Sequence, residues 1–321
     1  MKEIIKRTIE LLERNKEWEN RYSQYIKQIL QVKDGDNSRS FRTPEGLSLY
    51  SSVSRRNGKT YDLRFKGQSV GIIVCNEDEI ILRPRYETNK KFFNLELPEC
   101  VSWYSPEASA FRKCFRDMAK GSSDIKLKSP EHRIENRLLK EFSKRRRSEG
   151  KALCNIQPVK LYGCYFQFPT PVKASGHGPE YSKQYGGGID ILARIKTIEG
   201  DSRLCIMEVK DENKESESQT DAMTQAIIYA TFIAHLLRNK SGQKWWNFFM
   251  NRDCSSSPIP NQLNLDVVTI MPEGNTDEFV ENIVIPQLST TLHCHSIYYN
   301  TEELKNDKFV FTGTFPQQVK P

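Results

Sequence analysis

Two strand-like runs in the second half of the chain carry charged residues where a buried sheet is expected. The runs "IDILARI" (189–195) and "LCIMEVK" (204–210) are mainly apolar, but Asp190 stands near the start of the first, and Glu208 and Lys210 close the second. A charged side chain is costly to bury unless it is paired or bound to an ion. These three residues are therefore candidates for a chemical site.

The spacing of the three residues predicts a common location. Alternate residues of a strand share a face, so Glu208 and Lys210 point the same way. Asp190 lies about as far before the turn-like "TIEGDS" as Glu208 lies after it, so a hairpin places both carboxylates near the same end of adjacent strands. Two carboxylates repel unless a positive group lies between them, and Mg²⁺ prefers such oxygen ligands. The sequence therefore predicts a Mg²⁺ site beside Lys210.

The chemistry that fits this set is phosphodiester hydrolysis. A bound metal ion lowers the pKa of its water, polarises the phosphate and neutralises the developing charge. Lys210 would hold the attacking water or a phosphate oxygen. No protein nucleophile is required, and the sequence offers no nucleophile elbow and no evident Ser–His–Asp set.

The segments around these runs predict an α/β fold. From 129 to 272 the pattern reads helix, one or two strands, two further strands, helix and strand, and a sheet with helices on its faces buries such elements. The Gly-rich segment before Asp190 reads as a flexible loop, in which His177 and Lys183 either overhang the site or belong to a linker. The predicted elements are helix 129–147, strand or strands 154–172, loop 173–188, strands 189–196 and 203–210, buried helix 220–238, strand 263–272, helix 276–288 and possible strands 291–300 and 308–315.

The paired runs resemble the D…(D/E)-x-K core of the PD-(D/E)xK, or restriction-endonuclease-like, nuclease superfamily. The resemblance covers about 129–272, where the element order agrees with the αβββαβ core of that family. It implies a mixed sheet flanked by helices and a metal-dependent nuclease acting mainly on DNA. Asp190 and Glu208 would ligate Mg²⁺, or Mn²⁺ in its place, with the Val209 carbonyl as a further ligand, and Lys210 would position or activate the water. The proline that often precedes the aspartate in the family is replaced here by "GI".

The resemblance implies two further site residues. The first helix of the family core often supplies a glutamate, and Glu135 lies on an apolar stripe of the helix here, with Glu131 as its rival one turn earlier. The helix after the second run carries "QAIIY", which is similar to the Q-x-x-x-Y element of the exonuclease-like branch. Gln225 would bind a phosphate or a metal-bound water, with Tyr229 one turn on. Ordinary surface or helix-to-loop roles stay open for Glu135 and Gln225.

The first 120 residues predict a separate domain. The Asn57-Gly58 pair is a strong hairpin signal, and Ser105-Pro106-Glu107 is a helix start. The expected domains are an N-terminal helix and β domain over 1–120 and a nuclease-like domain over 121–321. The elements expected in the first domain are helix 2–32, an antiparallel meander over 47–84 and helix 105–120, with 121–130 as the junction.

Charge is unevenly distributed along the chain. The first 150 residues carry 32 Lys and Arg against 22 Asp and Glu, whereas the rest carry 16 against 19. A basic half suits a polyanionic partner, although a solvated basic surface is the alternative. No apolar run is long enough to span a bilayer, and the start of the chain lacks a signal-peptide core. The eight cysteines include no C-x-x-C pair, so we expect a reduced, cytoplasmic protein without a cysteine zinc site.

Three functional hypotheses follow from the sequence. The first is a Mg²⁺-dependent nuclease, on DNA rather than RNA, for which a homodimer, and its use in cutting both strands, stays open. The second is an inactive nuclease-like fold that binds nucleic acid or assembles complexes in a defence, repair or mobile-element system. In the third, the front half recognises the target while the back half dimerises. The aromatic run at Trp245, Trp246, Phe248 and Phe249 would stack on bases or close a core. The basic residues of the front half are Arg55, Arg56, Lys59, Arg64, Lys66, Arg83 and Arg85.

Overall fold

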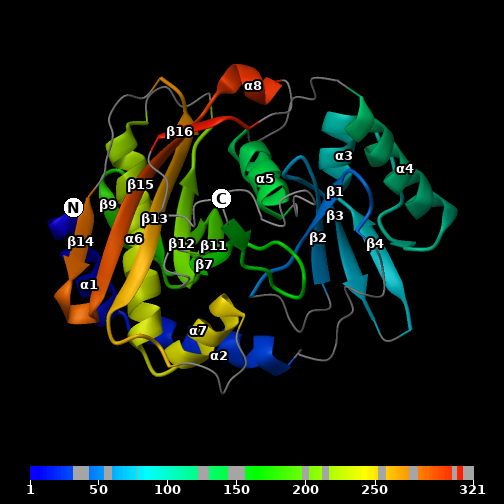
Figure 1. The fold of residues 1–321 in the computed structure, drawn as a ribbon. Helices are drawn as coiled ribbons and strands as arrows, with labels where there is room; N and C mark the ends of the chain where they lie inside the picture. Colours follow the sequence, from blue (N-terminus) through cyan, green and yellow to red (C-terminus); the bar gives the residue numbers. More distant parts are fainter. Residues whose placement is uncertain are drawn as a thin grey trace. The chain divides into compact units, whose positions relative to one another are not determined.

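The chain divides into two compact units (Figure 1). Unit 1 contains Met1–Ile26, Leu139–Val159 and Gln167–Pro321, and unit 2 contains Lys27–Leu138 and Lys160–Phe166. The computed structural model describes residues 1–31, 43–53, 60–76, 78–121, 130–143, 156–196, 202–211, 217–251, 258–274, 281–305 and 309–313.

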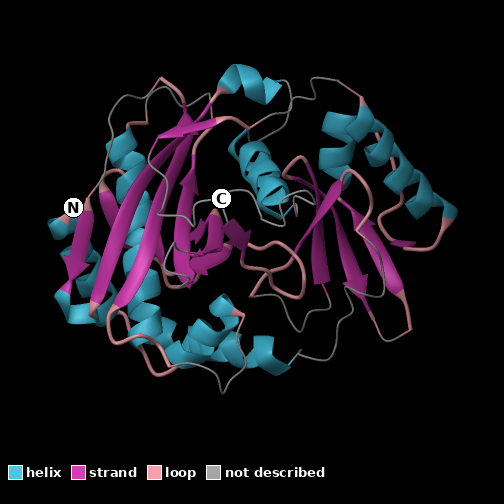
Figure 2. Cartoon of the chain, in the orientation of Figure 1, coloured by secondary structure: helices cyan, strands magenta, loops and turns pink. Residues whose placement is uncertain are grey.

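Unit 1 is built on a seven-stranded mixed sheet (Figure 2). Its order is β14-β15-β13-β12-β11-β6, and β16 pairs with β15. Strands β6, β11 and β12 are antiparallel neighbours, whereas β12, β13 and β15 run parallel. The predicted pairing of the two charged runs is confirmed, because Ile191 lies opposite Met207. The strands are β6 (Ile156–Pro158), β11 (Ile191–Lys196), β12 (Ser202–Val209), β13 (Leu263–Pro272), β14 (Asn282–Ile285), β15 (Thr290–Tyr299) and β16 (Phe311–Gly313).

Helix α6 (Gln219–Arg238) covers one face of this sheet and packs against β12, β13 and β15 (Figure 1). Its start is fixed by Ser218, whose hydroxyl oxygen accepts a hydrogen bond from the backbone N–H of Asp221 at 3.1 Å. The helix is apolar on most sides because both the sheet and helix α1 (Lys2–Arg14) contact it. The predicted buried helix is therefore confirmed.

The predicted single helix over 2–32 is wrong. The chain forms α1 and then α2 (Glu17–Gln31), with a break at Asn15. Two side chains satisfy carbonyl groups that the end of α1 leaves without a helical partner. The Asn15 amide donates to the Leu11 carbonyl at 2.8 Å, and the Trp18 indole donates to the Leu12 carbonyl at 3.0 Å.

The predicted domain boundary also differs from the structure. Residues Met1–Ile26 belong to unit 1, together with the large sheet, rather than to the β-rich unit. The reason is the apolar stripe of α1, formed by Ile5, Ile9 and Leu12, which is buried as α1 packs against α6. The boundary predicted at 120/121 differs as well, because unit 2 extends to Leu138 and also includes Lys160–Phe166.

The predicted loop over 173–188 is wrong, because most of this segment is strand. Strands β8 (Val172–Ser175) and β9 (Gly178–Tyr181) form a hairpin, and β10 (Gly187–Ile189) pairs with β7 (Phe168–Thr170). The hairpin closes through a short glycine-containing turn. Gly178 has φ +124° there, a conformation that other residues rarely adopt.

Aromatic rings form the core beside β7. Phe168 is fully buried, and its ring centroid lies 5.3 Å from that of Trp245 and 5.2 Å from that of Phe249. Both partners stand on α7 (Gly242–Met250). Tyr22 and Phe232 complete the cluster. Of the two open interpretations of this aromatic run, the structure confirms core closure.

The predicted helix over 276–288 is wrong where the structure describes it. Residues 282–285 form β14, and Pro286–Leu288 form a short 3₁₀ helix. Ile283 and Ile285 are buried while their neighbours are exposed, which is the period of a strand rather than a helix. Residues 275–280 lie outside the described residues. The late strands are present as β15 and β16, with α8 (Thr301–Lys305) between them.

Unit 2 is a five-stranded antiparallel sheet in the order β1-β2-β3-β4-β5. This confirms the predicted meander, although the Asn57-Gly58 pair lies outside the described residues. Phe65, Phe111 and Phe115 are fully buried between the sheet and α4. The elements of this unit are β1 (Leu47–Tyr50), β2 (Thr60–Phe65), β3 (Gln68–Cys75), β4 (Ile80–Pro84), α3 (Tyr86–Phe93), β5 (Val101–Ser102) and α4 (Pro106–Lys120).

The basic residues proposed for target recognition do not share one environment in unit 2. The Arg64 guanidinium is paired with the Asp62 carboxylate at 2.8 Å and lies 4.1 Å from the centre of the Tyr50 ring. Arg83 and Arg85 are exposed. Arg55, Arg56 and Lys59 lie outside the described residues. Recognition by this group stays a prediction, with Arg64 engaged inside the unit.

The start of α4 supports a first prediction. The Ser105 hydroxyl oxygen accepts a hydrogen bond from the backbone N–H of Ala108 at 3.2 Å, as an N-cap residue does. We expect Ser105→Ala to lower the free energy of unfolding of unit 2 by about 0.5–2 kcal/mol. Ser109→Ala, at an exposed position of the same helix, is the matched control and is expected to change it by less than about 0.5 kcal/mol. Urea unfolding measures both; equal values for the two variants would contradict the capping role.

No helix within the described residues is both long enough and apolar enough to cross a membrane.

Candidate metal centre

The two predicted carboxylates meet at the ends of adjacent strands in unit 1. Asp190 occupies the bend between β10 and β11, and Glu208 is the penultimate residue of β12. A carboxylate oxygen of Asp190 and one of Glu208 lie within 4.8 Å of each other. Both residues are buried, with 7% and 5% of their surface exposed. The convergence that their spacing predicts is therefore present in the structure.

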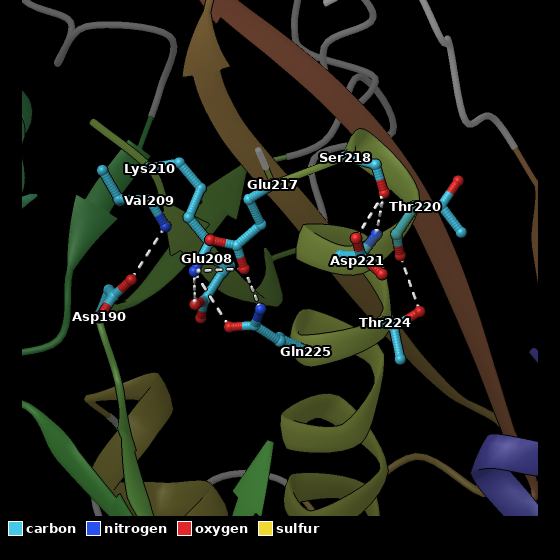
Figure 3. Close-up of polar contacts among 10 residues, drawn as sticks. All are labelled: Asp190, Glu208, Val209, Lys210, Glu217, Ser218, Thr220, Asp221, Thr224 and Gln225. Carbon is cyan, nitrogen blue, oxygen red and sulfur yellow. Dashed lines mark hydrogen bonds and ion pairs between the residues drawn. The ribbon is translucent and has the colours of Figure 1, made fainter. Parts of the chain in front are cut away.

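A backbone group holds Asp190 in place. The N–H of Val209 donates a hydrogen bond to Asp190 Oδ2 at 2.9 Å (Figure 3). This bond links the bend before β11 to the end of β12, so the carboxylate is tied to the strand that carries Glu208. The prediction that the Val209 carbonyl binds metal stays a prediction.

Lys210 is buried among acceptors directly after β12. Its Nζ donates to Glu208 Oε1 at 2.7 Å and to Gln225 Oε1 at 3.0 Å, and it lies 3.4 Å from Glu217 Oε1 (Figure 3). Only 3% of the lysine side chain is exposed. Glu208 and Lys210 thus project to the same side, as the alternation predicts. The ammonium group serves as the counter-charge of two carboxylates.

The backbone of Lys210 is anchored on both sides. Its N–H donates to the Ile270 carbonyl at 2.9 Å, and its carbonyl accepts from the Tyr299 hydroxyl at 3.0 Å. Strands β13 and β15 therefore fix the position from which the lysine side chain extends. A buried lysine would otherwise retain considerable rotamer freedom.

Gln225 joins the site from the first turns of α6. Its amide oxygen accepts from Lys210, and its amide nitrogen donates to the Glu217 carboxylate (Figure 3). The sequence predicts that Gln225 binds a phosphate or a metal-bound water. In the structure its two polar atoms are instead directed to Lys210 and Glu217, so its observed contacts are those of a positioning residue.

Sequence reasoning missed Glu217. This residue stands next to Ser218, the N-cap of α6, so the helix start determines where its carboxylate lies. The helix start was readable from the sequence, because a serine immediately before a helix is an N-cap pattern. Its link to Lys210 is not visible in the sequence, since it depends on how α6 lies on the sheet.

Tyr229 lies close to both carboxylates. Burial raises the pKa of its hydroxyl, and the negative charges of Glu208 and Asp190 raise the pKa further. A Cβ added to Gly187 would lie 2.5 Å from the tyrosine hydroxyl oxygen, so the glycine before Asp190 makes room for this ring. The resemblance to the Q-x-x-x-Y element assigned a role to Gln225 but none to Tyr229.

The two glutamates of the preceding helix stand in unit 2. Helix α5 (Pro130–Ser143) begins at Pro130 as predicted, and Glu131 and Glu135 lie on its N-terminal half. Glu135 is buried, and one of its carboxylate oxygens lies 3.2 Å from Nδ1 of His132. Their roles at the metal stay predictions.

The donor set of unit 1 fits a hard divalent cation. Asp190 and Glu208 offer carboxylate oxygens close to each other, and Glu217 adds a third carboxylate near Lys210. With one ammonium group among three carboxylates, these four side chains carry an excess of negative charge. Mg²⁺ is commonly held by one or two carboxylates and several waters, so the ligand types agree with the predicted ion.

Comparison with known proteins assigns no family to this chain. No family model matches it, and neither a curated protein nor a solved structure matches it.

Proposed function

We propose that unit 1 is a metal-dependent nuclease that hydrolyses phosphodiester bonds in DNA. The observation that carries this proposal is the convergence of Asp190 and Glu208 within 4.8 Å, with Lys210 bound to Glu208. Binding of a cation and a phosphate would explain why two acids and a lysine are buried together at adjacent strand ends. If these positions had only a structural role, apolar residues there would stabilise the fold at least as well.

The order of elements supports the proposal. Along the chain, α5, β6, β11, β12, α6 and β13 occur in the αβββαβ order of the PD-(D/E)xK core, with β7 to β10 between β6 and β11, α7 between α6 and β13, and the N-terminal part of α5 in unit 2. The antiparallel pairs β6–β11 and β11–β12 and the parallel pair β12–β13 form a mixed sheet. The additional strands β14, β15 and β16 extend this sheet beyond β13.

The proposed mechanism assigns a role to each side chain. Asp190 and Glu208 would hold Mg²⁺, which when bound supplies an activated water and stabilises charge on the phosphate. Lys210 places a positive charge beside Glu208, and one of its N–H groups would leave its present acceptor to donate to a phosphate oxygen or to the attacking water. As the water oxygen bonds to phosphorus, the bond from phosphorus to the leaving sugar oxygen would break; the water would lose a proton to solvent and the leaving oxygen would take one from solvent. Gln225 keeps the lysine aligned through the contact at 3.0 Å.

The experiment is a metal titration and a cleavage assay on the full chain. We expect the wild type to bind Mn²⁺ or Mg²⁺ by calorimetry and to cut plasmid, linear or single-stranded DNA. Asp190→Asn and Glu208→Gln are expected to remove the binding heat and to lower cleavage by more than about 100-fold. Asp190→Asn keeps an acceptor for the Val209 N–H, so it tests charge with the least disturbance of the fold.

The matched control is Asp266→Asn. Asp266 is also buried, but it lies opposite Cys205 in the β12–β13 register, so its side chain is on the other face of the sheet from Glu208. We expect this variant to bind metal and cut DNA like the wild type. Cleavage unchanged by both Asp190→Asn and Glu208→Gln would refute the proposed mechanism.

One observation favours the second hypothesis, a nuclease-like fold that binds without cutting. Lys210 is already engaged by Glu208, Glu217 and Gln225, and such a network also compensates buried charge. That hypothesis predicts DNA binding with no heat on Mn²⁺ addition. The same titration therefore separates the two functions.

A further inference from the structure

The loop between β9 and β10 is held firmly next to the candidate metal centre. Its ends are fixed by bonds from the Ser182 N–H to the Pro171 carbonyl at 2.8 Å and from the Gly186 N–H to the Thr170 carbonyl at 2.9 Å. The Arg21 guanidinium of α2 donates to the Gln184 carbonyl at 2.8 Å and also to the Lys183 carbonyl. The loop therefore presents its side chains from a defined backbone.

Tyr185 is the exposed aromatic residue of this loop. Its exposed fraction is 59%, the highest for an aromatic residue among the described parts of unit 1. The hydroxyl of Ser182 donates to the Tyr185 carbonyl at 2.9 Å, which fixes the backbone at this residue. An exposed ring on a braced loop loses little conformational entropy when a flat ligand stacks on it.

The ring lies beside the acids of the site. A Cβ added to Gly188, two residues before Asp190, would lie 2.8 Å from the Tyr185 hydroxyl oxygen. Burial raises the pKa of the Tyr229 hydroxyl, the charges of Glu208 and Asp190 raise it further, and Tyr185 adds to the same direction. The Tyr185 hydroxyl therefore lies against the segment that leads into Asp190.

The surroundings of Tyr185 match the chemistry of a nucleotide. Lys183 is exposed two residues away, where an ammonium group can contact a phosphate while the ring meets a base. Stacking of a base on an aromatic side chain requires an unpaired base, since bases within a duplex stack on each other. A ring at this position therefore favours a single-stranded segment over an intact duplex.

We propose that the Tyr185 ring is a stacking platform for an unpaired base next to the phosphate that is hydrolysed at the proposed metal centre. The substrate would then be DNA with a single-stranded segment. This inference rests on the proposed nuclease function, whose substrate it narrows. The platform would favour single-stranded over double-stranded DNA. It would not discriminate between bases, because stacking is tolerant of base identity.

The test measures binding of a fluorescent oligothymidylate to the full chain in EDTA, where no cutting occurs. We expect Tyr185→Ala to weaken binding by about 5- to 150-fold, while Tyr185→Phe and Tyr185→Trp stay within about threefold of the wild type. Binding of a blunt duplex of equal length should change by less than about threefold in Tyr185→Ala. Gln184→Ala, in the same loop, is the matched control and should bind like the wild type.

The outcomes separate this inference from the proposed function. The platform would be overturned if Tyr185→Ala bound oligothymidylate as tightly as the wild type, or if Tyr185→Phe weakened binding as much as Tyr185→Ala. Either result would count even if cleavage depended on Asp190 and Glu208. Selective weakening by Tyr185→Ala supports the platform even where no cleavage is found. Tighter binding of oligouridylate than of oligothymidylate would overturn the assignment to DNA. Unchanged thermal unfolding of each variant confirms that a binding change is local.

Discussion

Lys210→Met is expected to destabilise unit 1 by about 3–5 kcal/mol and to abolish cleavage. The lysine side chain is 3% exposed and bonds Glu208 at 2.7 Å, so its removal leaves a buried carboxylate without its cation. Methionine keeps the length and much of the volume of the side chain, so little of the effect arises from a cavity. Chemical denaturation measures the stability loss, and the cleavage assay measures the functional loss.

A double variant separates charge from packing in this prediction. Adding Glu208→Gln to Lys210→Met removes the unpaired buried charge, so we expect part of the lost stability to return while cleavage stays absent. Lys173→Met, at an exposed position of β8, serves as the surface control with an expected change of less than about 0.5 kcal/mol. A double variant that is less stable than Lys210→Met would argue against charge compensation at this position.

Phe168→Ala is expected to cost about 3–5 kcal/mol of unfolding free energy. The ring is fully buried and packs on Trp245 and Phe249, which cannot close the space that alanine leaves. Phe168 also lies opposite Ile189 in the β7–β10 pair, one residue before Asp190. The loss should therefore loosen the strand that delivers the carboxylate, and calorimetry should record weaker Mn²⁺ binding.

Two substitutions test that explanation. Phe168→Leu refills most of the space and is expected to cost less than half as much as alanine. Phe248→Ala, at a half-buried position on α7, is expected to cost less than Phe168→Ala and to leave Mn²⁺ binding unchanged. If Phe168→Ala and Phe248→Ala lowered the unfolding free energy equally, burial of the Phe168 ring would not explain the loss.

The parts of the site that follow from local pattern could be predicted from the sequence. Alternation along the two charged runs determined which residues share a face, and counting from the turn brought Asp190 near Glu208. The register in the structure agrees, with Ile191 opposite Met207. The buried helix at 219–238 was equally readable, because its apolar residues surround the axis.

The parts that depend on distant contacts could not be predicted. The sequence predicts a helix over 276–288, although Ile283, Val284 and Ile285 are β-branched residues that favour a strand, and pairing with β15 makes 282–285 a strand. The Gly-rich stretch before Asp190 looks flexible, but pairing between β7 and β10 orders its end. Glu217 joins Lys210 because α6 lies across the sheet, which no local pattern encodes. In each case tertiary pairing decided between conformations that the local sequence allows.

The hydrogen bond between the Val209 amide and the Asp190 carboxylate has a spectroscopic consequence. A main-chain nitrogen in the middle of the fold has the carboxylate of Asp190, a proposed metal ligand, as its acceptor, so its magnetic environment depends on what that carboxylate binds. A ¹⁵N label at Val209 would therefore report cation arrival at an interior position without any probe attached to the protein. Deuterium uptake at the same nitrogen would report how often β12 and the bend at Asp190 part from each other.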